Sequence, residues 1–309
     1  MKNFSGNATE DPVGAVGYLG PPGTFTHQAT LTHPALAERA HIPLADAESV
    51  IGAVARGSVE LGVLAWESSV AGLVGPTLDL LAASASEVRI RDDIALPVEM
   101  CLWTRPGARL GDVRRVASHA HALTQCRGWL RAHLPAATVR ETASTAAALE
   151  AVARDRRGTT AAIASAGAGN APGVRGVTVS RRAIGDIPDA VTRFVVLGLG
   201  AAGPREPRRA LLACFQPQNR PGSLLRILRV FADHGIELTH IESRPTRTGL
   251  GHYYFLVECL LPPSRAASLE RAAARLRGMG VRVKDLGATP FAPAGRSGAP
   301  GPAALGVPA

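Results

Sequence analysis

The chain has 309 residues, of which 46% are hydrophobic and only 4% aromatic, and it carries a formal net charge of +9. This length favours two domains, with cores built mainly from Ala, Val and Leu. The basic residues are mostly single arginines or short pairs such as Arg156-Arg157, with no Lys/Arg-rich run, so we expect a small anionic partner and no nucleic acid.

Cysteine usage and hydropathy narrow the class of protein further. Cys101, Cys126, Cys214 and Cys259 are far apart and form no CxxC pair, which argues against a thiolate metal site and indicates reduced thiols in a cytoplasm. The polar start of the chain lacks the apolar stretch of a signal peptide, and no run of about 18 apolar residues predicts a membrane helix. We therefore expect a cytoplasmic protein without membrane contact.

Three segments have the composition of non-globular chain. We expect residues 1–13 to be a disordered N-terminus, residues 200–208 a linker rich in Gly, Pro and charge, and residues 291–309 a disordered tail. The folded parts are then 14–199 and 209–290.

The first folded part alternates strand-like and helix-like runs. Strands are predicted at 16–19, 61–66, 115–118, 159–165 and 193–199. Helices are predicted at 24–38, in a run ending at 83, at 120–133 and at 144–154. This alternation predicts an α/β fold with mostly parallel strands, in which ligands bind beyond the carboxyl ends of the strands.

The second folded part predicts the order βαββαβ, a ferredoxin-like split unit. Its strands are expected at 210–216, 236–243, 252–260 and 281–286. Pro221 is expected at the first position of one helix, which Gly235 ends, and Ser264 is expected to cap a second helix over 265–279.

Polar residues follow the predicted strands of the first part. Thr24 and Thr26 lie in a Gly-Pro turn at a helix start, where free N–H groups and the helix dipole favour an anion. Glu67, Ser68 and Ser69 place a carboxylate and two hydroxyls directly after an apolar strand. Such residues are also common as helix caps and solvated loop residues, so neither group identifies a site alone.

Two further groups precede predicted helices. Ser118 and His119 end a strand, and Gln125 follows Ser118 by nearly two helical turns, which puts both on one face and makes His119 a possible general base. Ser144 and Thr145 open an Ala-rich helix, where they are equally typical of an ordinary N-cap.

The last group is Thr192-Arg193-Phe194, at the entry to an apolar strand. Thr192 offers a hydroxyl donor. Arg193 is either a carboxylate clamp or the partner in a structural ion pair, and we favour the ion pair.

Taken in order, these motifs resemble those of the prephenate dehydratase family. That family carries a GxxGTFS turn, an ENSxxG loop, an SHPQxxxQC segment, an ST-initiated helix, an AAIAS strand and a TRF triplet. The matching residues here are Gly20 with Gly23-Thr24-Phe25-Thr26, Glu67-Ser68-Ser69 with Gly72, Ser118-His119 with Gln125-Cys126, Ser144-Thr145, Ala161-Ala162-Ile163-Ala164-Ser165 and Thr192-Arg193-Phe194. The match extends over about residues 15–286, because the second part resembles the family's ACT domain.

The sequence departs from the family pattern at several positions. Ser68 replaces an Asn, Ala71 replaces a Glu, Ala120-His121 replaces Pro-Gln, and the Asn that usually precedes the TRF triplet is absent. The loss of the Asn amide at Ser68 puts the rate or the identity of the substrate in question.

The resemblance implies a two-lobed, periplasmic-binding-protein-like dehydratase domain around a cleft, with a second lobe at about 100–182 and crossings near 96–103 and 180–190. It implies that prephenate is converted to phenylpyruvate for phenylalanine synthesis, with no metal or organic cofactor. Thr192 would help the ring hydroxyl to leave, with Glu67 and Ser68 beside it as catalytic residues. The substrate-binding residues would be Thr24, Thr26, Ser69, Ser118, His119, Gln125, Ser144, Thr145, Arg193 and Phe194.

The same resemblance implies regulation through the C-terminal ACT domain. In relatives this domain binds phenylalanine between paired subunits, so we expect a homodimer or a homotetramer with phenylalanine as effector. The implied lining is Asn219, Pro221, Gly222, Ser223 and Leu224, which stand near the family's PGAL, together with Glu242, Ser243, Arg244 and Pro245, its intact ESRP.

Three alternatives stay open at this point. The changes at Ser68 and Ala71 would suit a prephenate decarboxylase that does not aromatise the ring, although the retained Thr192 argues against it. Arogenate dehydration is a close variant of the same chemistry. A catalytically dead protein that senses an amino acid would bind phenylalanine without turnover.

Overall fold

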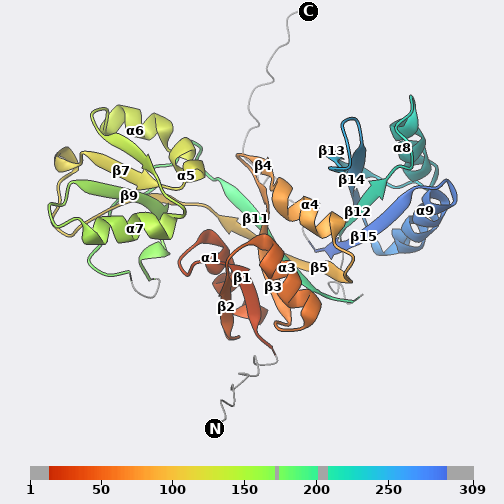
Figure 1. The fold of residues 1–309 in the computed structure, drawn as a ribbon, viewed down its shortest axis with the longest axis horizontal. Coiled ribbons are helices and arrows are strands. Elements are labelled where there is room, and N and C mark those ends of the chain that lie inside the picture. Colours follow the sequence, from red (N-terminus) through yellow and green to blue (C-terminus); the bar gives the residue numbers. More distant parts are fainter. Residues whose placement is uncertain (1–13, 171–173, 201–207, 291–309) are drawn as a thin grey trace, which may run out of the picture.

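The computed structural model describes residues 14–170, 174–200 and 208–290. The predicted disordered N-terminus, nearly all of the predicted linker and the predicted tail lie outside these ranges. Figure 1 shows three bodies in a row, with the second lobe at the left, the first lobe in the middle and the C-terminal domain at the right. Within the described ranges, no helix is long and apolar enough to cross a membrane.

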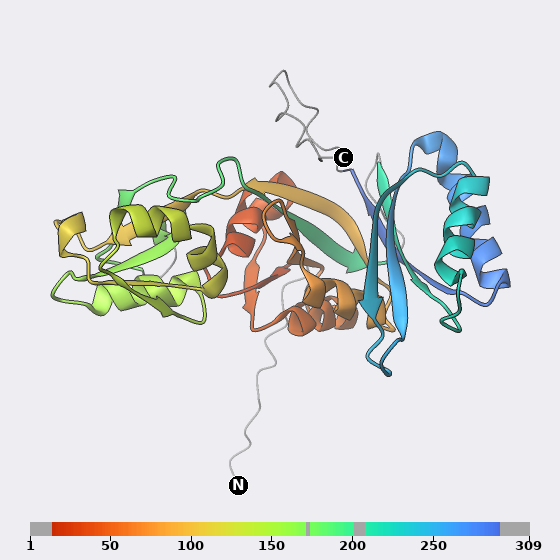
Figure 2. The same ribbon diagram turned by 90° about the horizontal axis from the view of Figure 1, so that it is seen from above.

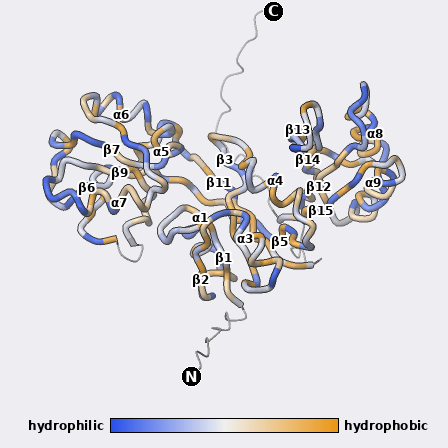
Figure 3. The backbone as a smooth tube through the Cα atoms, viewed as in Figure 1, coloured by the Kyte–Doolittle hydropathy of each residue, from blue (hydrophilic) through white to orange (hydrophobic). Residues whose placement is uncertain are grey.

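The first lobe consists of the N-terminal part of the chain and one strand that returns from the second lobe. Its elements are β1 (Val16–Leu19), α1 (Phe25–Thr32), α2 (Pro34–Ala37), β2 (His41–Leu44), α3 (Ala47–Arg56), β3 (Leu61–Ser68), β4 (Gly72–Leu73), α4 (Gly75–Ala83), β5 (Val88–Pro97) and β11 (Val191–Leu199). Hydrophobic residues run along β1, β3 and β11 (Figure 3), and apolar clusters lie on both faces of these strands.

The second lobe is a smaller sheet with helices on both faces. Its elements are β6 (Met100–Thr104), η1 (Leu110–Asp112), β7 (Arg115–Ser118), α5 (Ala120–Gln125), α6 (Arg127–His133), β8 (Thr138–Glu141), α7 (Thr145–Arg154), β9 (Thr160–Ser165), η2 (Ala168–Asn170) and β10 (Thr178–Arg181). One apolar cluster joins the sheet to α5 and α6, and another joins its opposite face to α7.

The sheets are mixed, so the expectation of mostly parallel strands is wrong. In the described residues, β1 runs parallel to β2 and β3, whereas β11 runs antiparallel to both β3 and β5. In the second lobe, β7 is parallel to β8 and β9, whereas β6 is antiparallel to β9 and β10. The antiparallel pairs of the first lobe arise where the chain crosses between the lobes. There β5 leads out of the first lobe, and β11 returns to it beside β5 in the opposite direction.

Two predicted helices are each broken in two. The helix predicted at 24–38 breaks at His33, which is extended (φ −85°, ψ 120°) because Pro34 disfavours a helical residue before it. The helix predicted at 120–133 breaks at Cys126. There the carboxylate of Asp186, on the returning segment, accepts hydrogen bonds from the N–H groups of Gly128 (2.7 Å) and Trp129 (2.9 Å) and so caps α6.

The C-terminal domain has the predicted order βαββαβ. Its elements are β12 (Arg209–Phe215), α8 (Ser223–Asp233), β13 (Leu238–Pro245), β14 (Tyr253–Leu260), η3 (Pro263–Arg265), α9 (Ala266–Gly278) and β15 (Arg282–Thr289). Figure 2 shows both helices on the outer face of this sheet. Their apolar sides, including Ile227, Phe231 and Leu276, are buried against it.

Two predicted helix starts in this domain are wrong. Pro221 precedes the N-cap Gly222, whose positive φ of 78° turns the chain into α8. Ser264 lies inside the short η3 turn, and α9 begins after Arg265 with no capping hydrogen bond from a side chain. In both places the chain uses an extra turn that proline and serine patterns do not specify.

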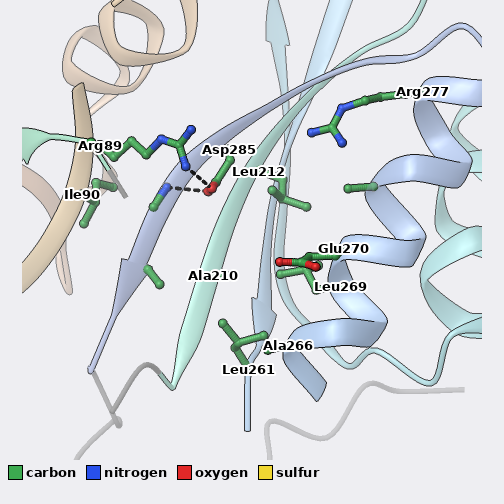
Figure 4. A pocket seen from close by; sticks show the side chains of 14 residues that line it. Arg89, Ile90, Ala210, Leu212, Leu261, Ala266, Leu269, Glu270, Arg277 and Asp285 are labelled. Carbon is green, nitrogen blue, oxygen red and sulfur yellow. Dashed lines mark hydrogen bonds and ion pairs between the residues drawn. The ribbon is translucent and has the colours of Figure 1, made fainter. Parts of the chain in front are cut away.

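One ten-stranded sheet, among the described residues, connects the first lobe to the C-terminal domain, in the order β13-β14-β12-β15-β5-β11-β3-β1-β2 with β4 on β3. At the junction, Gly287 of β15 pairs with Ile90 of β5. A Cβ atom on Gly287 would lie 2.1 Å from the Ile90 carbonyl oxygen, and its φ is 109°. Beside this contact, Arg89 donates to the Asp285 carboxylate at 2.8 Å (Figure 4). Only glycine fits at this junction.

We predict that Gly287→Ala lowers the melting temperature more than a positive-φ substitution alone can explain. Gly57→Ala is the matched control, because Gly57 has a φ of 72° but open space around the added methyl group. Backbone strain of about 1–2 kcal/mol is expected at either position, and the clash with Ile90 adds to it at Gly287. Thermal unfolding of both variants checks this, and equal losses would contradict the close approach.

Candidate active site

A pocket of about 550 Å³ lies between the two lobes. Its walls come from the β1–α1 turn, the segment between β3 and α4, and the starts of α5 and α7. The ends of β5, β6 and β11, where the chain crosses between the lobes, complete them. The lining residues are Leu19, Gly20, Thr24, Phe25, Thr26, Ala65, Ser68, Ala71, Gly72, Leu73, Val74, Gly75, Pro76, Val98, Met100, His119, His121, Ala122, Gln125, Ala143, Ser144, Thr145, Thr192 and Phe194. The pocket therefore opens at the carboxyl ends of β1, β3, β7 and β8, as expected for an α/β fold.

Four helices of the described residues direct their N-termini at this pocket. Thr24 caps α1 and accepts a hydrogen bond from the N–H of His27 at 3.3 Å, and Ser144 caps α7 and accepts one from Ala147 at 3.1 Å. His119 occupies the N-cap of α5. Gly75 begins α4, which has no side-chain cap. Each helix N-terminus carries about half a positive charge. The helices of both lobes therefore favour the binding of an anion in the pocket.

None of the described residues that line the pocket is Lys, Arg, Asp or Glu. Its polar groups are hydroxyls, one amide, two imidazoles and the helix starts, and its apolar groups include Phe25, Met100 and Phe194. An anion can therefore bind here through uncharged donors, with a ring against the apolar wall. No carboxylate in the lining would repel it, and none would bind an ammonium group.

Thr192 and Ser68 are directly opposite each other on β11 and β3. Residues at opposite positions of an antiparallel pair have Cβ atoms about 5 Å apart, so both hydroxyl-bearing side chains reach one point of the pocket wall. Ser68 Oγ also accepts a hydrogen bond from the N–H of Val70 at 3.2 Å, which holds the turn that follows the strand.

Arg193 does not line the pocket, although it is adjacent to Thr192. Successive side chains of a strand point to opposite faces, and Arg193, which is 3% exposed, points toward the C-terminal domain. Its guanidinium donates to Asp93 Oδ2 at 2.7 Å, to Glu258 Oε2 at 2.9 Å and to Thr289 Oγ1 at 2.8 Å. The carboxylate-clamp interpretation of Arg193 is therefore wrong, and the structural ion pair is present.

The buried carboxylate of Glu258 also belongs to this cluster. Burial alone would raise its pKa, but the Arg193 charge and hydrogen bond outweigh burial, so the pKa of Glu258 is lowered. Glu258 further accepts hydrogen bonds from Arg209 and from the hydroxyl of Thr239. The cluster thus ties β11 of the first lobe to β14 of the C-terminal domain through buried ion pairs.

Three other residues of the predicted site lie outside the pocket lining. Ser118 is fully buried, and its hydroxyl donates to the Ile163 carbonyl at 2.6 Å, so it joins β7 to β9. Ser69 exchanges two hydrogen bonds with Val191, the residue before Thr192. Glu67 lies on the opposite side of β3 from Ser68, with its carboxylate 3.7 Å from Arg193 Nη1. All three residues contact the strands that form the pocket wall but do not line the pocket.

Sequence reasoning missed His121 as part of the pocket. It lies one helical turn before Gln125, and its Nε2 is 2.8 Å from the Gln125 amide nitrogen. Burial and the neighbouring His119 both lower the pKa of His121. The i, i+4 spacing from Gln125 was the available signal, because residues four apart on a helix are neighbours.

The predicted effector residues divide between two faces of the C-terminal domain. Leu224 packs against its apolar core, and Asn219 Nδ2 donates to the Gly251 carbonyl at 2.9 Å, which links the turn before α8 to the β13–β14 hairpin. On β13 the side chains alternate, so Ser243 and Pro245 are exposed. Glu242 and Arg244 are partly buried on the side that faces α4. Pro221, Gly222 and Ser223 form the tight entry to α8.

Comparison with known proteins assigns both parts of the chain. The model of the prephenate dehydratase family matches residues 16–201, and that of the ACT domain matches residues 211–275. A prephenate dehydratase of Mycobacterium bovis (strain BCG / Pasteur 1173P2) is 35% identical over 292 residues, covering 90% of this chain and 88% of the relative.

Solved structures give the same fold. A prephenate dehydratase from Arthrobacter aurescens in complex with L-Phe superposes with a TM-score of 0.80 at 34% identity, covering 89% of each chain. GqqA, described as a novel type of quorum quenching acylase, superposes with a TM-score of 0.75 at 29% identity, covering 90% of this chain and 98% of its own. These likenesses confirm the predicted fold class, a two-lobed α/β domain followed by an ACT domain.

We predict that Arg193→Met destabilises the protein by about 3–5 kcal/mol, because it leaves the buried carboxylate of Asp93 without its partner and removes one of the two arginines paired with Glu258. The matched control is Arg39→Met, which removes the exposed ion pair with Glu60 and should cost less than about 1 kcal/mol. Denaturant unfolding curves of the two variants give the comparison.

Arg193→Lys distinguishes the structural role from a clamp, because it keeps a charge but cannot fork between two carboxylates. A structural role predicts lower stability with a near-normal KM in the folded fraction. A KM raised by tenfold or more in a folded variant would support the interpretation of Arg193 as a carboxylate clamp.

Proposed function

The chain belongs to the prephenate dehydratase family, and we propose that the pocket between its lobes converts prephenate to phenylpyruvate, which would make it a carbon–oxygen lyase. One observation carries the proposal: four helix N-termini and the Thr192–Ser68 pair surround an uncharged pocket of about 550 Å³. The sequence match to the family over both domains supports it.

The reaction needs two things from the pocket. Prephenate is a dianion, so its carboxylates require donors, and the starts of α1 and α4 in the first lobe face those of α5 and α7 in the second. Its ring must also lose CO2 and hydroxide together. The electron pair of the breaking C–COO⁻ bond becomes part of the aromatic ring as the C–O bond to the hydroxyl breaks.

Thr192 would assist the departure of hydroxide. A threonine hydroxyl does not release its proton at neutral pH, so we propose that it donates a hydrogen bond to the leaving oxygen as negative charge develops there. Such a preorganised donor contributes about 3–4 kcal/mol to lowering the barrier. Ser68, opposite on β3, would place a second hydroxyl at the same point in place of the amide that the family pattern has there.

The pocket favours prephenate over arogenate. Arogenate carries an ammonium group where prephenate has a keto oxygen, and a buried ammonium needs an acceptor with negative charge. No carboxylate is present among the described lining residues, so the ammonium would find only neutral acceptors there.

The likeness to GqqA raises hydrolysis of an acyl bond as a second chemistry, since one fold can host several activities. Hydrolysis by a serine or threonine needs a base hydrogen-bonded to the nucleophile. In the described pocket, His119 Nδ1 accepts from the N–H of His121, and His121 Nε2 meets Gln125. Because the His119 ring is bonded to a backbone N–H and the His121 ring to the Gln125 amide, neither is hydrogen-bonded to a hydroxyl of the described residues, and we prefer the dehydratase.

We propose that phenylalanine regulates the enzyme through the ACT domain, as the complex of the Arthrobacter relative with L-Phe suggests. The start of α8 at Gly222 has no side-chain cap, and Ser243 and Pro245 are exposed on the edge strand β13. An effector carboxylate would bind at the start of α8, where the helix dipole favours negative charge, and pairing through β13 would give a homodimer or homotetramer.

We place the reaction in the cytoplasm, because the four cysteines, all within the described residues, are free and buried.

We predict that Thr192→Val lowers kcat by about 100- to 1,000-fold with a small change in KM, because a hydrogen bond made mainly in the transition state is lost. Thr192→Ser keeps the hydroxyl and should retain activity within about tenfold. Phenylpyruvate formation, followed by its absorbance in alkali, measures both. Equal activity of the Val variant and wild type would remove Thr192 from the mechanism.

We predict that lower pH strengthens prephenate binding through His121. Its pKa lies below the ordinary histidine value of about 6.5, so the side chain is neutral at pH 7.5 and gains a proton, and a positive charge, only as the pH falls below that value. The KM for the dianion should therefore fall between pH 7.5 and 5.5 in the wild type. His121→Gln, which restores the residue of the family pattern, should flatten this slope, whereas an unchanged slope would exclude His121.

A further inference from the structure

One carboxylate at the domain junction receives four hydrogen bonds from the ACT domain. Asp79, on α4, accepts from Arg244 at both oxygens, with Nε–Oδ1 at 3.0 Å and Nη2–Oδ2 at 2.8 Å. The hydroxyl of Tyr254 donates to Oδ1 at 2.8 Å, and Arg247 Nη2 donates to Oδ2 at 3.0 Å. We call Asp79 and these three partners the α4 junction cluster.

The cluster is charged and sensitive to geometry. Burial works to raise the pKa of Asp79, but the hydrogen bonds from Arg244 and Tyr254 outweigh it, so the pKa is lowered and the carboxylate is ionised at neutral pH. The fork of a guanidinium on both oxygens of a carboxylate fixes distance and orientation together. A shift of β13 would therefore move α4 or break the fork.

Helix α4 carries this contact directly to the pocket. Asp79 lies about one helical turn after Gly75, and Gly75 and Pro76 line the pocket between the lobes. The Arg244 guanidinium also lies against Gly75, because a Cβ atom there would be 2.5 Å from Arg244 Nη2. One side chain of the ACT domain thus touches the first residue of α4 and binds the residue one turn further on.

Arg244 comes from the segment in which the effector is expected to bind. On β13 its neighbours Ser243 and Pro245 are exposed on one side of the strand, while Arg244 points to the other side, at α4. A ligand or partner subunit that binds the exposed side of β13 would therefore not occupy Arg244. It would act on α4 by moving the strand that holds Arg244.

We propose that Asp79 and Arg244 are positioning residues that transmit the state of the ACT domain to the substrate pocket through the start of α4. The inference rests on the proposed function, since it concerns the regulation of the same site. The fork holds Gly75 and Pro76 in place at the pocket wall. Effector binding shifts β13, the fork loosens, and the α4 N-terminus no longer faces the substrate carboxylate.

Asp79→Asn tests the coupling with little change in shape. Asparagine still accepts from Tyr254 but cannot form the doubly bonded ion pair with Arg244. The matched control is Arg89→Gln, which breaks the ion pair with Asp285 at the same domain junction (Figure 4). Arg89 lies near the start of β5, and neither it nor Asp285 lines the active-site pocket.

The experiment measures phenylalanine binding by calorimetry and its effect on kcat/KM in the three proteins. We expect phenylalanine to inhibit wild type and Arg89→Gln by the same factor, within the 5- to 150-fold range usual for allosteric coupling. Asp79→Asn should bind phenylalanine with a Kd within about threefold of the wild-type value. Phenylalanine should lower the kcat/KM of this variant by less than about twofold. Inhibition of Asp79→Asn equal to that of wild type would overturn the proposal.

Hydrogen exchange at the amides of α4 gives a readout that needs no turnover. We expect faster exchange in the first turn of α4 in Asp79→Asn, and in wild type on adding phenylalanine, but not in Arg89→Gln. Unchanged exchange in Asp79→Asn overturns the inference whether or not the enzyme acts on prephenate. Wild type without any turnover of prephenate contradicts the proposed function instead, so the two failures are distinguishable.

Discussion

The burial of the Arg193 guanidinium is the constraint on which the arrangement of the protein depends. A charge that is 3% exposed must be surrounded by partners, and among them are Asp93 on β5, Glu258 on β14 and Thr289 on β15. The ACT domain is therefore joined to the dehydratase part by a continuous sheet and by a buried ion pair. Because neighbouring residues of a strand face opposite ways, the same strand that is anchored at Arg193 presents Thr192 to the pocket.

The second organising feature is that the anion site uses no cationic side chain. The net charge of +9 suggested an anionic partner, yet no Lys or Arg is among the described residues that line the pocket. Helix N-termini from both lobes supply the positive potential instead. This arrangement makes the site depend on where each helix begins, so a contact that moves the start of α4 can change binding without touching the substrate.

The sequence predicted local structure well where a short-range signal existed. The βαββαβ order followed from strand patterns and helix periodicity, and the predicted hydroxyls at helix starts, with Thr192 and Phe194, do line the pocket. It failed where the outcome depends on distant residues. The partners of Arg193 lie 65 and 100 residues away in the chain, and the cap of α6 comes from Asp186, so neither is visible in a local pattern.

The errors at the site have the same origin. Arg193 and Ser118 were grouped with their neighbours by adjacency in the sequence, although a strand sends adjacent side chains to different faces. The effector role of Arg244 stays a prediction, but its bonds to Asp79 appear only when α4 and β13 are brought together by the fold. His121 was overlooked because it departs from the family pattern.

The most direct test of the account is the fate of prephenate with the purified wild-type protein, compared with arogenate under the same conditions. The account predicts that phenylpyruvate accumulates in step with the loss of prephenate and that arogenate reacts more slowly, because the pocket lacks a carboxylate for its ammonium group. Consumption of prephenate without phenylpyruvate would indicate decarboxylation alone, and no consumption would indicate a sensing protein. Either result would contradict the role assigned to the pocket between the lobes.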